Sequence, residues 1–106
     1  MHKVLEGERF MTYKDKEIIL KYIFKNYPVI KDYYLKEPES DYGTKPDLNT
    51  LINRSLRRIS KESRRIITKE YVEGADEDWW YEFYSRSSYY RLKNKALDEF
   101  IRQLNG

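Results

Sequence analysis

Apolar residues recur at three- and four-residue steps over several stretches of the chain, a spacing typical of α-helices. The clearest stretch is the last one, which follows Ser85, a residue suited to cap the first free backbone N–H groups. Its apolar stripe consists of Tyr89, Leu92, Ala96, Phe100 and Leu104. The opposite side carries polar, aromatic and basic residues: Ser87, Tyr90, Arg91, Asn94 and Lys95. The pattern predicts an amphipathic helix over residues 86–104.

An N-terminal helix is predicted over Asp15–Tyr27, because Pro28 disfavours helical backbone at the residue before it. Its apolar stripe is built on Ile19, Tyr22 and Ile23 and is widened by Ile18, Leu20 and Phe24. A stripe this broad indicates a helix that is sandwiched or that forms an association face, so a homodimer through Ile18–Phe24 is one hypothesis. A further short helical turn is expected around residues 29–34, which would complete a helical hairpin.

In the middle of the chain, the sequence predicts a basic helix that begins at Pro46 and Asp47. Proline is favoured in the first turn of a helix, and an acidic residue is favoured at the positive end of the helix dipole. Ser60 either caps a new helix over Lys61–Val72, or the helix continues unbroken from Asp47. Gly74 is suited to a helix C-cap, and a short aromatic helix is predicted over Asp76–Phe83.

These predictions give an all-α fold, since no stretch shows strand alternation. Residues 1–36 form an N-terminal arm and helical hairpin, the arm covering residues 1–14. Residues 37–46 form a loop that contains Pro38, Gly43 and Pro46. Residues 47–106 form the long basic helix followed by a tri-helical helix-turn-helix.

Composition narrows the classes of function. A chain of 106 residues suits one domain with a modest core, and the absence of cysteine excludes disulfides and thiolate metal sites. We expect a cytoplasmic protein without a membrane span, cofactor or metal. An enzyme is not expected, because the serines before Tyr89 lack a neighbouring base to activate them and no phosphate-binding glycine loop occurs.

Charge is unevenly distributed. The net charge is only +3, but residues 54–69 are basic, residues 70–82 are acidic, and the chain is basic again from Arg86. This layout suggests two segments that face phosphates and one that faces away, although surface charge also fluctuates along any soluble helical chain. The basic residues expected to contact phosphates or a partner are Arg54, Arg57, Arg58, Arg64 and Arg65.

Three successive helices over residues 61–72, 76–83 and 86–104 match a tri-helical helix-turn-helix, whose last helix reads base edges in the major groove. Arg91 is suited to a bidentate contact with guanine and Asn94 to adenine. Further contacts to bases or phosphates are expected from Arg86, Ser87, Tyr90, Lys95 and, extending from the apolar side, Lys93. A solvated amphipathic helix on a helical bundle has the same composition and period.

The aromatic residues of 79–84 have two interpretations. They are core residues wedged between helices, or they stack on single-stranded bases beside a cationic groove. The surrounding acids, Asp76–Asp78 and Glu82, argue against nucleic acid on this face. They are instead suited to a basic surface of RNA polymerase or of a partner subunit.

The run Ser85-Arg86-Ser87-Ser88-Tyr89-Tyr90-Arg91-Leu92-Lys93, with Lys95-Ala96-Leu97 after it, resembles the C-terminal signature of the ArpU/RinA-type phage transcriptional regulators. Arg64-Arg65-Ile66-Ile67, Tyr71 and Gly74 resemble the first helix of that domain, and the resemblance covers residues 46–104. The family has a helix-turn-helix similar to region 4 of bacterial sigma factors.

The resemblance implies a regulator that binds double-stranded promoter DNA and activates late or packaging genes of a phage, prophage or phage satellite. It places DNA reading on Arg86, Ser87, Tyr90, Arg91, Asn94 and Lys95. The sigma-like resemblance also suggests that RNA polymerase is recruited. The alternative is a protein-interaction module that binds polymerase or a packaging component and never reads DNA.

Overall fold

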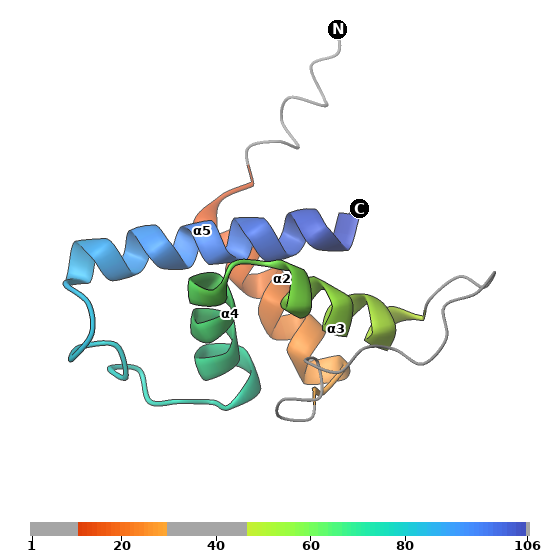
Figure 1. The fold of residues 1–106 in the computed structure, drawn as a ribbon, viewed down its shortest axis with the longest axis horizontal. Helices are drawn as coiled ribbons and strands as arrows, with labels where there is room; N and C mark the ends of the chain where they lie inside the picture. Colours follow the sequence, from red (N-terminus) through yellow and green to blue (C-terminus); the bar gives the residue numbers. More distant parts are fainter. Residues whose placement is uncertain (1–10, 30–46, 106) are drawn as a thin grey trace, which may run out of the picture.

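The computed structural model describes residues 11–29 and 47–105. Within these ranges the elements are α2 (Tyr13–Asn26), α3 (Leu48–Arg58), α4 (Lys61–Ile67), the π-helical turn η2 (Thr68–Val72) and α5 (Arg86–Asn105). These residues contain no strand, so the predicted all-α fold is confirmed. The loop over 37–46 and the helical turn near 30–34 lie outside the described residues. Figure 1 shows α5 running across the molecule, with α2, α3 and α4 below or behind it in this view.

Helix α2 begins two residues before the predicted start. Thr12 is its N-cap: the Thr12 hydroxyl accepts a hydrogen bond from the Asp15 N–H, and the Asp15 carboxylate accepts one from the Thr12 N–H. This reciprocal capping box places Asp15 in the first turn rather than at the helix start. The helix ends at Asn26, one residue before the predicted end, with Tyr27 as its C-cap before Pro28.

A break at Ile59 and Ser60 separates α3 from α4, so the unbroken helix is excluded. Asp47 caps α3, and Ser60 caps α4 by accepting a hydrogen bond from the Ser63 N–H at 3.2 Å. The Ser60 N–H also donates to the Glu99 carboxylate of α5 at 3.0 Å. Ser60 therefore starts α4 and joins it to α5.

The predicted short helix over Asp76–Phe83 is wrong: these residues form successive turns, so the middle helix of the predicted tri-helical helix-turn-helix is not formed. Gly74 ends η2 with a φ of +66°, a conformation in which glycine is favoured. Trp79, Tyr81 and Phe83 then donate backbone hydrogen bonds to the carbonyls three residues earlier. Aromatic residues are modest helix formers and a short helix is marginal, so ring packing decides the backbone here.

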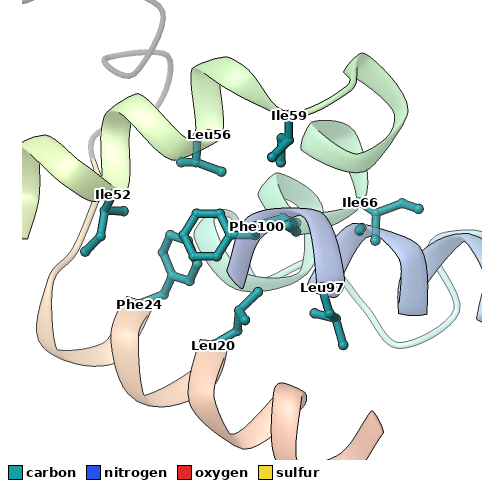
Figure 2. Packing of buried hydrophobic residues seen from close by; sticks show 10 residues of the cluster. Leu20, Phe24, Ile52, Leu56, Ile59, Ile66, Leu97 and Phe100 are labelled. Carbon is teal, nitrogen blue, oxygen red and sulfur yellow. The ribbon is translucent and has the colours of Figure 1, made fainter. Parts of the chain in front are cut away.

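The hydrophobic core forms around Phe100 of α5, which Figure 2 shows among side chains of α2, α3 and α4. The Phe100 and Phe24 rings lie 5.4 Å apart, and complete burial of such a side chain stabilises the fold by about 1.5–3 kcal/mol. The other buried residues of this core are Leu20, Ile52, Leu56, Ile59, Ile66, Ile67, Ala96 and Leu97. The core therefore contains residues from both ends of the chain.

The predicted stripe of α5 is confirmed, with Tyr89, Ala96 and Phe100 buried and Leu92 and Leu104 half-buried. The stripe of α2 is displaced from its predicted position. Leu20 and Phe24 are its buried residues, and Ile19 and Ile23 pack beside them. Ile18 and Tyr22 are exposed. The homodimer through this helix stays a prediction.

Candidate nucleic-acid interface on helix α5

The six residues predicted to read DNA are all exposed on α5. They are Arg86, Ser87, Tyr90, Arg91, Asn94 and Lys95, and we call them the outer face. At about 100° of rotation per residue, Ser87, Arg91 and Asn94 point away from the side that carries Ala96 and Phe100. Arg86 and Tyr90 lie nearer the buried side. The core therefore fixes the helix so that the outer face is presented to solvent.

Local contacts at the start of α5 follow from the sequence. Ser85 accepts a hydrogen bond from the Ser88 N–H at 3.2 Å, which confirms the predicted cap. The Asn94 amide oxygen accepts one from the Lys16 ammonium at 3.3 Å, and Lys95 lies 3.9 Å from the Glu99 carboxylate. In the part of the chain that the structure describes, the Arg91 side chain has no hydrogen bond or ion pair. Its guanidinium is accordingly available to a ligand.

Lys93, expected at a phosphate, is instead inside the molecule. Its ammonium group lies 2.8 Å from a Glu17 carboxylate oxygen of α2 and 2.7 Å from one of Glu70. The rings of Tyr13 and Tyr71 each have their centroids 5.6 Å from it. Lys93 is four residues after Tyr89 and seven before Phe100, so the helical period places it among the buried residues. A phosphate contact from this side chain is excluded.

The ion pairs change the acidity of this group. Burial by itself lowers the pKa of Lys93, but its hydrogen bonds to Glu17 and Glu70 outweigh burial and raise that pKa above its ordinary value. Burial likewise opposes ionisation of Glu17, yet the hydrogen bond from Lys93 holds the Glu17 pKa below its ordinary value. Burial raises the pKa of Tyr71. At neutral pH the lysine and Glu17 are thus both charged.

Among the arginines of residues 54–65 that were expected to contact phosphates or a partner, Arg64 has a structural role that the sequence did not reveal. Its guanidinium donates to the carbonyls of Leu56, Arg57 and Ile59, at 2.9, 3.1 and 3.3 Å. These bonds satisfy carbonyl groups at the end of α3, which lack partners within the helix. These bonds engage the Nε and one terminal nitrogen of Arg64, and its expected contact with a phosphate or a partner stays a prediction.

Two other arginines of this group, Arg58 and Arg65, have exposed side chains. The Arg65 guanidinium lies 4.4 Å from the Phe83 ring centroid, a cation–π distance. Arg54 and Arg57 are half-buried, and both have partners. Lys61, Arg65 and Lys69 follow one another at four-residue steps and line a shallow hollow of about 240 Å³. Helix α4 and the π-helical turn η2 therefore present a basic stripe.

Acidic residues border one end of the outer face. Arg86 and Tyr90 line a hollow of about 460 Å³ together with Glu77, Asp78, Trp80 and Tyr81, which we call the acidic hollow. Its carboxylates repel phosphate, so the first turn of α5 is less suited to DNA than the turns that carry Arg91 and Asn94. The sequence showed an acidic segment before α5, but not that the turns of this segment place Glu77 and Asp78 next to the first turn of α5.

The fold and this site define an all-α protein whose C-terminal helix presents polar and basic side chains to solvent. Comparison with family models, with curated proteins and with solved structures gives no match in any of the three. The resemblance to the ArpU/RinA-type regulators therefore stays a prediction from the residues that carry it. Within residues 11–29 and 47–105, no helix combines the length and apolar character needed to cross a membrane.

Proposed function

We propose that the protein binds duplex DNA through the outer face of α5 and regulates transcription from promoter DNA. The observation that carries this proposal is that all six residues expected to read DNA are exposed on a single helix. That helix is held from behind by a core that includes α2, α3 and α4. A rigid helix with exposed polar side chains is what insertion into the major groove requires.

Within this face we assign base reading to Arg91 and Asn94 and a phosphate contact to Lys95, whereas Arg86 lies beside the carboxylates of the acidic hollow. Among residues 11–29 and 47–105 the Arg91 guanidinium has no partner, and it is suited to the two acceptors on the major-groove edge of guanine. The basic stripe of α4 and η2 offers further phosphate contacts through Lys61 and Lys69. The resemblance extends the proposal to activation of late or packaging genes by recruitment of RNA polymerase.

Binding to duplex DNA across a salt series tests this proposal, using duplexes from upstream of the gene and from a random pool. Arg91→Ala should weaken specific binding by about 1–3 kcal/mol and relax preference at one base pair. Arg102→Ala is the matched control, since Arg102 is an exposed arginine near the other end of α5, paired with Asp98 at 3.1 Å. Absence of salt-dependent binding to any duplex would refute DNA binding.

Exposed aromatic residues favour a second candidate, a module that binds RNA polymerase or a packaging component without reading DNA. Tyr81 and Phe83 are 67% and 54% exposed, next to the carboxylates of Asp78 and Glu82. Aromatic residues are enriched in protein–protein interfaces. The two candidates differ in the salt series, because this one predicts no sequence-specific complex with duplex DNA.

A further inference from the structure

A further cavity lies on the flank of α5 opposite Arg91, between α2, the segment 70–80 and α5. Its volume is about 440 Å³. Five aromatic side chains line it, and we call it the aromatic cavity: Tyr13, Tyr71, Trp80, Tyr89 and Tyr90. The charged residues that line it are Glu17, Lys21, Glu70, Asp76, Glu77 and Lys93. Of the outer face, only Tyr90 contributes to this cavity.

The aromatic rings are held by one another. Trp80 and Tyr89 are stacked, with ring centroids 4.3 Å apart and an angle of 5° between the planes. Tyr90 stands edge-on to both, with centroids 5.0 Å from Tyr89 and 6.1 Å from Trp80. Tyr13 approaches Tyr90 from α2 at 6.4 Å. Rings at such different angles give the cavity walls of aromatic faces and edges in fixed positions.

The charge of the lining is negative. Four carboxylates, of Glu17, Glu70, Asp76 and Glu77, stand against the ammonium groups of Lys21 and Lys93, which leaves a net charge of −2. Lys93 is engaged by Glu17 and Glu70. Asp76 and Glu77 are exposed, and in the described part of the chain neither side chain forms an ion pair. A phosphate would be repelled, whereas a cation would find free carboxylates next to aromatic rings.

We propose that the aromatic cavity binds the cationic side chain, arginine or lysine, of a basic segment of a partner protein. Aromatic faces attract a cation through their quadrupole, and this attraction grows as the site excludes water. The acidic hollow adjoins the cavity, since both are lined by Glu77, Trp80 and Tyr90. Together they accommodate the residues on either side of the inserted cation, so the ligand is a peptide segment rather than a free amine.

This inference does not depend on DNA binding. Ser87, Arg91, Asn94 and Lys95 do not line the aromatic cavity. Substitution of Arg91 should therefore weaken a specific DNA complex without changing the affinity for a basic peptide. Removal of the Asp76 and Glu77 charges should weaken binding of the basic peptide and leave the DNA complex unchanged. The two proposals consequently fail independently.

The test is a titration of tryptophan fluorescence with a blocked Gly-Gly-Arg-Gly-Gly peptide, because Trp80 lies in the cavity wall. We expect saturable quenching, and at least about fivefold weaker binding when the arginine is replaced by citrulline, which keeps the shape but not the charge. The double variant Asp76→Asn, Glu77→Gln should weaken binding by about fivefold as well. Glu82→Gln is the matched control, since Glu82 is an exposed acid of the same segment that lines neither space.

Three results would overturn the proposal. The first is quenching that does not saturate, or that is equal for the arginine and citrulline peptides. The second is an equal loss in Glu82→Gln and in the double variant, which would indicate general attraction by the acidic segment. The third is equal affinity for the peptide and for a single arginine with blocked amino and carboxyl groups, which would show that no peptide segment is recognised. Backbone circular dichroism of each variant verifies that the fold is retained.

Discussion

Replacement of Lys93 by methionine tests the ionic group that joins three parts of the fold. The substitution keeps an unbranched side chain of similar length but removes the charge that Glu17 of α2 and Glu70 of η2 share. Both carboxylates would lose their cationic partner and keep only the hydrogen bonds from the Tyr71 hydroxyl to Glu17 and from the Trp79 indole to Glu70. The attraction between the ammonium and the rings of Tyr13 and Tyr71 would also be lost. We expect the variant to fold and to be less stable.

The magnitude follows from the exposure of the three side chains. Removal of one partner from a fully buried ion pair costs about 3–5 kcal/mol, because a charge is left without compensation. Here the Lys93 side chain is 6% exposed, whereas those of Glu17 and Glu70 are 24% and 15% exposed, so water solvates the orphaned carboxylates in part. We therefore expect a loss of about 2–3 kcal/mol.

Urea denaturation monitored by circular dichroism measures this loss. The matched control is Lys95→Met on the same helix, whose 64% exposed side chain and 3.9 Å ion pair predict a change within about 0.5 kcal/mol. The triple variant Glu17→Gln, Glu70→Gln, Lys93→Met should recover part of the stability, because no charge is left unpaired. Equal stability of Lys93→Met and Lys95→Met would refute the reasoning.

Two further predictions concern pH and helix capping. The Glu17 pKa is held below its ordinary value of 4.5, so the stability that the charged Glu17 contributes is fully present above pH 4.5 and is lost as the pH falls through the lowered pKa. The Lys93 pKa is raised above its ordinary value of 10.5, so the stability that the charged Lys93 contributes is fully present below pH 10.5 and is lost as the pH rises through the raised pKa. The stability difference between wild type and Lys93→Met should therefore shrink at both extremes, and a constant difference from pH 3 to 7, about the range over which such carboxylates titrate, would contradict it. Ser60→Ala removes the cap of α4 and should cost about 1 kcal/mol in urea denaturation, whereas Ser87→Ala, at an exposed helical position, should cost less than about 0.5 kcal/mol.

Local signals in the sequence predicted most of the helices. The stripe from Tyr89 to Leu104 gave α5 nearly to the residue, because a period sustained over many turns leaves little ambiguity. Cap residues were also informative: Ser60 and Ser85 cap helices as their hydroxyls suggest. The start of α2 was missed although its signal is local, since Thr12 and Asp15 have the spacing of a capping box.

Long-range contacts could not be predicted in the same way. Spacing placed Lys93 on the buried side, but its partners Glu17 and Glu70 come from elements distant in sequence. The aromatic cavity depends on the same kind of contact, because Tyr13 of α2 meets Tyr90 of α5. The backbone of residues 76–83 was mispredicted for a related reason: its conformation depends on rings such as Trp80, which stack on a later helix.

The sharing of one core by α2 and α5 has a consequence for cooperativity. Phe24 packs on Phe100, and Glu17 neutralises Lys93, so the first and last described helices are stabilised by the same contacts. A fragment that starts at residue 47 would expose the apolar surface that Leu20 and Phe24 cover, and would leave Lys93 with one carboxylate. We therefore expect the described parts of the chain to unfold as a single unit, so that loosening of α2 also loosens the helix that presents Arg91.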